Sequence, residues 1–153
     1  MATPAAGDGG DEAPPVDHGF THVALPVSDI DRSLDFYRRF ADMDVVHRRT
    51  SDDGVDVAWI TDHTRPFVIV LLQTPPSHVL GGWSHLGVGV DSREEVDRRL
   101  SDAATGGFTT LGPLDHGRPT GYWGIIADPD GHNLELSYGQ EVAFTVDRSA
   151  EPE

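Results

Sequence analysis

The sequence predicts an α+β domain of two βαβββ modules, whose strands form a pseudo-symmetric curved sheet around a cleft. Three observations support this prediction: a weak internal repeat, a strand followed by a helix at the start of each repeat, and three strand-like stretches after each helix. The 153 residues are enough for one such domain, which would bury roughly 70% of the surface that its unfolded chain exposes.

The internal repeat aligns residues 20–27 with residues 83–90, and it gives His22 and His85 matching positions. Both segments alternate as half-buried strands do. In each segment three apolar residues at alternate positions share one face: Val23, Leu25 and Val27 in the first, and Leu86, Val88 and Val90 in the second. We therefore expect each histidine to point to the opposite face of its strand.

Each of these strands is expected to lead into a helix. Ser28 with Asp31, and Ser92 with Glu95, have the spacing of N-capping pairs. Apolar residues follow at helical spacing in both segments, namely Ile30, Leu34 and Tyr37 in the first, and Val96, Leu100 and Ala103 in the second. The glycines at 106–107 are expected to end the second helix.

Three strand-like stretches follow each helix, and turn-forming residues separate them. They lie near 45–49, 55–60 and 67–72 in the first half, and near 108–111, 122–127 and 134–138 in the second. A single domain at 18–139 therefore contains module one at 20–76 and module two at 83–139. Trp59, in the second of these stretches, is expected to lie in the core.

The two ends of the chain have a different composition from the domain. Residues 1–17 consist mostly of Ala, Gly, Pro and Asp, and are expected to form a disordered leader. Residues 140–153 form an acidic C-terminal tail. Its alternating Val142, Phe144 and Val146 predict either an edge strand or docking on the domain.

Composition excludes several classes of function. The chain has no cysteine, so any metal must be held by nitrogen and oxygen ligands. A formal charge of −15 repels phosphate backbones and anionic lipids, so neither nucleic acid nor a membrane is an expected partner. No apolar stretch has the length of a bilayer span or the character of a signal peptide, which predicts a soluble, cytoplasmic protein.

Glu135 is the third candidate metal ligand. It lies in the strand after the turn at 128–131, on the face opposite Leu134 and Leu136. If the faces that carry His22, His85 and Glu135 line one concave surface, the three side chains converge on one divalent ion. Two imidazoles and a carboxylate favour Fe(II), with Mn, Ni or Zn as alternatives, and leave adjacent positions open for substrate, water or oxygen.

Residues 19–139 resemble the vicinal oxygen chelate superfamily, which includes glyoxalase I, extradiol dioxygenases, fosfomycin-resistance transferases, methylmalonyl-CoA epimerase and bleomycin-binding proteins. The resemblance rests on segments 22–37, 83–90 and 128–136. It implies the glyoxalase/bleomycin resistance/dihydroxybiphenyl dioxygenase fold, with Glu135 at the position of the family's last metal carboxylate. It also implies a homodimer, whose site is completed either within one chain or by exchange of modules between two.

The resemblance implies three possible functions. Glyoxalase I and the epimerase have a fourth protein ligand in the last strand of module one, where this sequence has Val70 or Leu72. A three-ligand site is therefore expected. It favours a non-haem dioxygenase-type oxidoreductase that chelates a small substrate through adjacent oxygens. The alternatives are a lyase or isomerase similar to lactoylglutathione lyase, and a metal-free drug-binding resistance protein.

His116 and Tyr122 are the candidate catalytic residues. An imidazole with a pKa of about 6.5 suits proton transfer near neutral pH. Extradiol enzymes also carry a histidine, followed by a tyrosine three residues before the Asp-Pro turn. His116 matches the first loosely. Ile125 occupies the second position, and Tyr122, three residues earlier, would face the other way in a regular strand.

The remaining histidines are expected to have structural or exposed roles: His18, His47, His63, His78 and His132.

Overall fold

The computed structural model describes residues 15–150. Residues 1–14 of the expected leader and residues 151–153 of the expected tail lie outside the described residues. Within the described range, no helix is long and apolar enough to cross a membrane.

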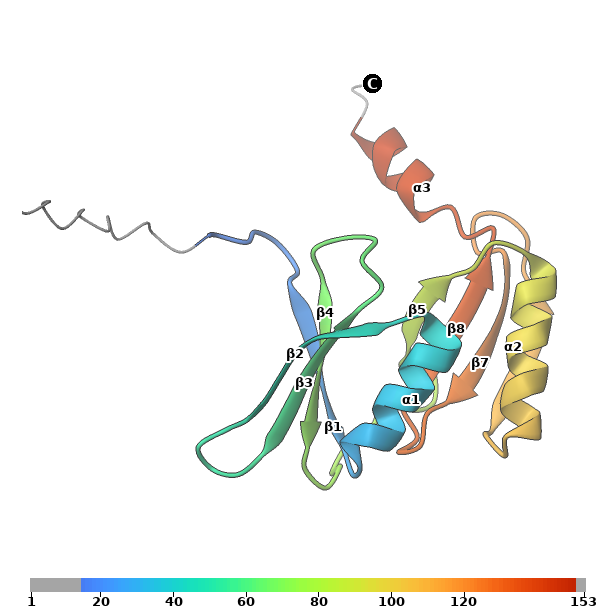
Figure 1. The fold of residues 1–153 in the computed structure, drawn as a ribbon. Helices are drawn as coiled ribbons and strands as arrows, with labels where there is room; N and C mark the ends of the chain where they lie inside the picture. Colours follow the sequence, from blue (N-terminus) through green and yellow to red (C-terminus); the bar gives the residue numbers. More distant parts are fainter. Residues whose placement is uncertain (1–14, 151–153) are drawn as a thin grey trace, which may run out of the picture.

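Each module forms one four-stranded sheet (Figure 1). Sheet A has the order β1-β4-β3-β2 and consists of β1 (His22–Val27), β2 (Asp44–Thr50), β3 (Asp56–Thr61) and β4 (Val68–Gln73). Sheet B has the order β5-β8-β7-β6 and consists of β5 (Leu86–Gly89), β6 (Thr110–Asp115), β7 (Tyr122–Ala127) and β8 (Asn133–Tyr138). In both sheets the first strand is parallel to the fourth, and the other pairs are antiparallel. The sequence repeat is therefore a structural repeat, and the predicted fold class is confirmed.

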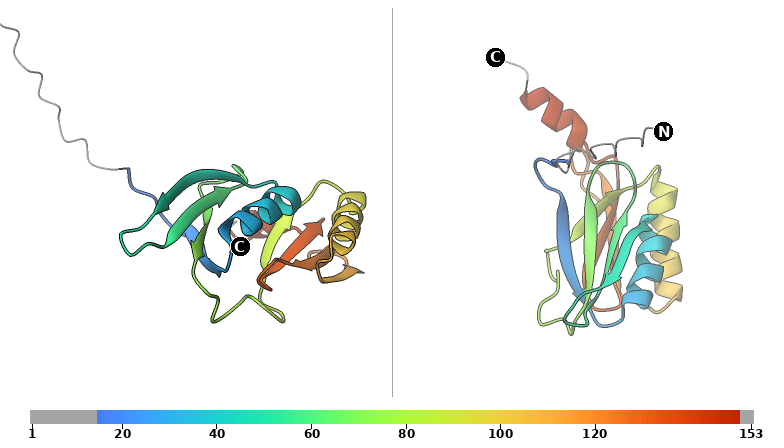
Figure 2. Two further views of the ribbon diagram at one scale, coloured as in Figure 1. Left: turned by 60° about the horizontal axis from the view of Figure 1, so that its bottom comes forward. Right: turned by 60° about the vertical axis from the view of Figure 1, so that its left-hand side comes forward.

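Helix α1 (Ile30–Ala41) lies between the two sheets, and α2 (Arg93–Thr105) covers sheet B (Figure 2). One apolar core joins the inner face of sheet A, both helices and the inner face of sheet B. It contains Leu71 of β4, Phe40 of α1, Leu100 of α2 and Leu136 of β8. Because both helices pack against inner faces, each sheet has an opposite face that no helix within residues 15–150 covers, here called its open face.

The helix boundaries agree with the sequence except at one cap. Ser92 caps α2 as predicted, since its side chain accepts a hydrogen bond from the backbone N–H of Glu95. Gly106 is the C-cap of the same helix. At α1 the predicted cap Ser28 is wrong by one residue, because the carboxylate of Asp29 accepts from the N–H of Arg32. Aspartate at this position provides the same acceptor as serine and adds a favourable negative charge.

A buried cluster in the β7–β8 turn joins the two modules. The Tyr37 hydroxyl of α1 donates to Asp128 at 2.9 Å. The other carboxylate oxygen of Asp128 accepts from the backbone N–H groups of residues 130 and 132. The fully buried ring of His132 accepts from the N–H of Leu80 at Nδ1, so its Nε2 donates to the carbonyl oxygen of Pro26 at 2.8 Å. The Asp-Pro turn is thus a structural link between the modules.

The C-terminal tail forms helix α3 (Val142–Ser149), which extends away from the domain (Figure 1). The edge-strand alternative for this segment is therefore wrong. None of the residues of α3 is buried, and its apolar side chains Val142, Phe144 and Val146 are all exposed. These three apolar side chains therefore do not dock on the domain.

Candidate metal centre

His85 and Glu135 are the two predicted ligands that the structure brings together. His85 directly precedes β5, and Glu135 lies in the neighbouring strand β8. The Nε2 atom of His85 lies 3.3 Å from Oε2 of Glu135. The Glu135 side chain is 8% exposed and the His85 side chain 32%, so the pair is accessible from the histidine side.

This spacing suits a shared metal ion. Two donor atoms about 2.1 Å from one ion, at an angle of about 90° to 110°, lie roughly 3.0 to 3.4 Å apart. The 3.3 Å between the two donor atoms is within that range. Without an ion, the same contact is an ion pair when the histidine is protonated.

Both side chains are also oriented by a second contact. The Nδ1 atom of His85 lies 2.7 Å from the carbonyl oxygen of Trp83. A carbonyl oxygen only accepts, so Nδ1 carries a proton and the neutral ring keeps its free lone pair at Nε2. The other oxygen of Glu135, Oε1, accepts a hydrogen bond from the side-chain amide of Gln140 at 2.9 Å. The sequence indicated no role for Gln140, because nothing in a polar tail reveals that it folds back onto β8.

The backbone beside Glu135 leaves space for a further group. Gly87 is the partner of Glu135 in the β5–β8 ladder, and Gly89 is the partner of Ser137. A Cβ atom added at either glycine would meet no atom within 4 Å. The open face of sheet B is therefore bare along β5, next to the candidate ligands.

His22 lies on the open face of the other sheet. Its Nδ1 atom lies 2.9 Å from the hydroxyl of Thr21. Its side chain lines a hollow of about 700 Å³ with Trp59, Val70 and Leu72. Within residues 15–150, no three His, Asp or Glu side chains lie close enough to hold an ion together. The expected convergence of His22 with the other two ligands therefore does not occur within one chain.

The fourth-ligand positions considered from the sequence carry no donor atom. Val70 and Leu72 are half-buried and face the same hollow as His22. Gln73, the next residue, has its side-chain oxygen bound to the N–H of Ile30 at the start of α1. The last strand of module one thus contributes an apolar wall.

The two candidate catalytic residues lie on different faces of sheet B. Trp123 is paired with Ser137, on the same face as Glu135, and the ring of His116 packs against Trp123 with centroids 5.4 Å apart. His116 is exposed, so it lies beside the open face and can exchange protons with solvent. Tyr122 lies on the helix side, where its hydroxyl donates to Asp97 of α2 at 2.6 Å. This hydrogen bond, followed by burial, raises the pKa of Tyr122. Tyr122 does not reach the His85–Glu135 pair.

Sequence comparison identifies relatives over most of the domain. The profile of the Glyoxalase/Bleomycin resistance protein/Dioxygenase superfamily matches residues 19–136. An uncharacterized protein of Pseudomonas aeruginosa is 34% identical over 124 residues, which are 78% of this chain and 88% of that protein. A lactoylglutathione lyase of Neisseria meningitidis is 28% identical over 121 residues, which are 75% of this chain and 86% of the lyase.

Structure comparison gives the same fold. A mutant of the fosfomycin resistance protein FosX from Listeria monocytogenes, crystallised with Mn(II) and a dihydroxypropylphosphonic acid, matches with a TM-score of 0.65. The two are 16% identical, and the match covers 84% of this chain and 99% of that one. At this identity the likeness establishes the fold alone.

Proposed function

Because this chain belongs to the Glyoxalase/Bleomycin resistance protein/Dioxygenase superfamily, we propose that it is a metal-dependent enzyme acting on a small molecule. In this proposal His85 and Glu135 of one chain hold a divalent ion together with His22 of a second chain. The substrate binds the same ion through two adjacent oxygens. The cytoplasmic location expected from the sequence stays a prediction.

The observation that carries this proposal is the His85–Glu135 pair. Its donor atoms are 3.3 Å apart, and each side chain is fixed by a contact on its far side. Two ligand atoms that are already held in place lose less entropy when they bind an ion. Hydrogen bonds that orient metal ligands in this way typically change metal affinity tenfold or more. The FosX mutant was crystallised with Mn(II), which is consistent with a divalent ion on this fold.

The open faces support a site shared between two chains. His22 faces an open hollow on sheet A, whereas the other two ligands border a bare strand on sheet B. A second copy that sets its sheet A against sheet B of the first brings His22 to the pair, and the reciprocal contact forms a second identical site. Such an exchange is a closed twofold arrangement, which is the commonest symmetry of homo-oligomers.

The side chains around the pair have separate roles in this proposal. When bound, the ion polarises the chelated oxygens of the substrate and holds them in a fixed orientation. His85 and Glu135 keep their donor atoms directed at one point. His116 exchanges a proton with the substrate from the rim of the open face, where its imidazole is exposed.

For the reaction class, we propose first an oxygenase-type reaction with Fe(II). This choice depends on Val70 and Leu72, since an apolar strand leaves three protein ligands and more exchangeable positions than a four-ligand site. A second candidate is a glyoxalase-type lyase, and the identity to a lactoylglutathione lyase favours it. Oxygen uptake by the iron-loaded protein with catechol-like substrates supports the first candidate. Turnover of a methylglyoxal–glutathione hemithioacetal by the nickel- or zinc-loaded protein supports the second.

Metal analysis tests the proposed ligands directly. Protein purified without chelator is expected to contain about one divalent ion per chain, and replacing His22, His85 or Glu135 by Ala should remove most of it. His116→Ala is the matched control, because His116 lies near the site without being a proposed ligand, and it should keep its ion. Full occupancy in Glu135→Ala, or a wild-type protein that takes up no ion, would contradict the proposal.

A further inference from the structure

The open face of sheet A carries three rows of side chains that cross the strands. The ladder pairs Arg49 with Val57 and Val57 with Leu72, and these three form the first row. The second row is His47, Trp59 and Val70, and the third ends at Val68 and His22. One end of the face therefore holds a cation and the diagonally opposite end holds the proposed metal ligand.

The middle of this face is apolar and accessible. Trp59 was expected in the core, but strand alternation turns Ala58 and Ile60 inward, and the indole is 42% exposed. His47 packs on it with ring centroids 5.1 Å apart. Val70 and Leu72 continue the apolar surface across β4. A flat indole beside aliphatic side chains suits a planar apolar ligand.

Arg49 is one of three arginines of the described residues, with Arg32 and Arg65, that have neither an ion pair nor an aromatic ring beneath them, and Arg49 and Arg65 both line the hollow. The chain has 26 Asp and Glu residues against 11 cations, so most arginines find a carboxylate. Six arginines do so in the described residues: Arg38, Arg48, Arg93, Arg98, Arg99 and Arg118. Two others, Arg39 and Arg148, lie over aromatic rings. Among residues 15–150, no carboxylate oxygen lies within salt-bridge distance of Arg49, which lines the same hollow as His22.

The distance across the face sets the size of a ligand. His22 and Arg49 lie three strands apart and two rows apart, which is roughly 19 Å between their Cα atoms. When both side chains lean over the face toward each other, they and an ion at His22 occupy about half of that distance, which leaves a span on the order of 10 Å, the length of one or two aromatic rings.

We propose that the substrate is a planar, apolar molecule, most simply an aromatic one, with an anionic group at the end remote from its chelating oxygens. Arg49 binds the anionic group, and Trp59 packs against the apolar body. A guanidinium binds a carboxylate through two parallel hydrogen bonds, which fixes orientation as well as charge. The inference rests on the proposed function for the position of the chelating end.

A pair of probes of nearly equal size and shape, one anionic and one neutral, tests this inference. We use 1-naphthaleneacetate and 1-naphthaleneacetamide, titrated by ligand-observed NMR at low ionic strength into protein stripped of metal with EDTA. The carboxylate is expected to bind about tenfold more tightly than the amide, although the net charge of the protein is −15. Arg49→Gln should abolish this preference and leave binding of the amide unchanged. Trp59→Leu should weaken binding of both probes to a similar degree.

Arg32→Gln is the matched control for charge. Arg32 is exposed on α1, away from the hollow, and forms no ion pair in the described residues, so this variant should keep the preference. Equal losses in Arg49→Gln and Arg32→Gln would overturn the inference, because they indicate a general charge effect. Loss of the preference in Arg65→Gln alone would also overturn it, since Arg65 lies near His22. Equal binding of the two probes, or no binding of either up to 10 mM (about the limit for weak ligands), would overturn it as well.

Binding measurements on metal-free protein distinguish a failure of this inference from a failure of the proposed function. A preference that vanishes after EDTA and returns with added Zn²⁺ means that the anion binds the ion; the proposed function then stands and the inference fails. A preference that depends on Arg49 in a protein that takes up no ion supports the inference, while the proposed function fails.

Discussion

Gln140 connects the candidate ligand Glu135 to the C-terminal end of the domain. Its amide donates to one oxygen of Glu135, while the other oxygen faces His85. The next residue, Glu141, is held by Arg118 and by the carbonyl oxygen of Pro119. These contacts fix the chain just before α3 begins, so the position of Gln140 does not depend on that helix.

Replacing Gln140 by Met is expected to weaken metal binding tenfold or more and to leave the fold intact. Methionine has a similar size but no N–H donor, so Glu135 loses the contact that fixes its orientation. The measurement is a titration of metal-free protein with Zn²⁺ in competition with a chromogenic chelator. Glu141→Gln is the matched control, since Glu141 makes no contact with Glu135. Equal affinities in wild type and Gln140→Met would show that Gln140 does not orient the ligand.

Because of Tyr37, the stability of the protein should depend on pH in the alkaline range. Burial, followed by the charge of Asp128, raises the pKa of Tyr37 well above its ordinary value of 10.0. The folded state therefore keeps the phenol proton at a pH where the unfolded state loses it. The resulting stabilisation is complete below pH 10 and is lost as the pH rises through the raised pKa of the folded state.

Tyr37→Phe should consequently be less stable than wild type at pH 7, by about 1 to 2 kcal/mol, because Asp128 loses one hydrogen bond. Between pH 9 and pH 11, urea unfolding of this variant should lose less stability than that of wild type. Tyr122→Phe serves for comparison, because the hydroxyl of Tyr122 donates to the exposed Asp97 and its pKa is raised less far than that of Tyr37, so this variant should change the pH profile less. Parallel pH profiles for wild type and Tyr37→Phe would contradict the assignment.

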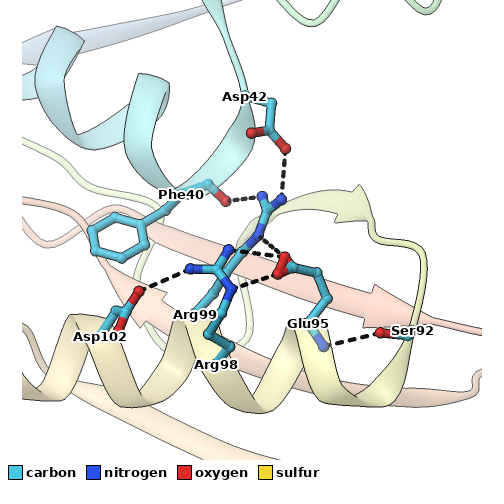
Figure 3. A network of polar contacts seen from close by, with 7 residues as sticks. All are labelled: Phe40, Asp42, Ser92, Glu95, Arg98, Arg99 and Asp102. Atoms are coloured by element: carbon cyan, nitrogen blue, oxygen red, sulfur yellow. Dashed lines mark hydrogen bonds and ion pairs between the residues drawn. The ribbon is translucent and has the colours of Figure 1, made fainter.

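At the scale of the elements, Arg99 joins α2 to the end of α1 (Figure 3). Its guanidinium donates to the carbonyl oxygen of Phe40 at 2.9 Å and to the carboxylate of Asp42 at 2.7 Å. Arg99 is buried, whereas its neighbour Arg98 is exposed and binds Glu95 and Asp102 on its own helix. The hydrogen bond from Arg98 lowers the pKa of Glu95 to about 2.

These two arginines make a matched pair for mutation. Arg99→Ala should destabilise the protein by about 2 kcal/mol, because it leaves the Phe40 carbonyl unpaired and removes buried aliphatic carbon. Arg98→Ala should have a much smaller effect, since exposed ion pairs within a helix contribute little. Thermal or urea unfolding of both variants provides the measurement. Equal losses of stability in the two variants would mean that the contact of Arg99 between the helices contributes no more than the surface ion pairs of Arg98.

Most elements could be predicted from the sequence because their signals are local. Strand alternation and turn residues predict β2, β3, β4, β7 and β8 to within one or two residues. The internal repeat predicts a strand that includes His85, whereas β5 begins one residue later, at Leu86. Trp59 was assigned to the core by residue type alone, although its strand alternation points it outward. The helical state of α3 was missed because alternation over five residues also occurs by chance on an exposed helix.

The site was predictable in its residue types but not in its assembly. A repeat reveals that His22 and His85 occupy equivalent positions, yet it cannot reveal which sheets face each other. In the folded chain, α1 occupies the space between the inner faces of the sheets, so the open faces point away from the core. Each chain therefore carries one part of each of two proposed sites, which two chains complete together.

The last prediction tests this arrangement on the whole molecule. If His22 of one chain joins His85 and Glu135 of another, a mixed dimer of His22→Ala and Glu135→Ala chains contains one site with both changes and one intact site. Refolding the two variants together should restore metal binding, up to one ion per mixed dimer, although neither variant binds metal alone. Each variant refolded by itself provides the baseline.

Refolding His85→Ala with Glu135→Ala is the matched control. Both residues come from the same chain in every site, so each site of that mixed dimer lacks one ligand and no metal binding should return. Recovery in this control would indicate that the ligands do not divide between chains as proposed. If the first mixture recovers no metal, while native mass spectrometry confirms mixed dimers, His22 completes the site within its own chain or is not a ligand. Metal content measured against the fraction of mixed dimer therefore decides between a shared site and two sites that are each contained in one chain.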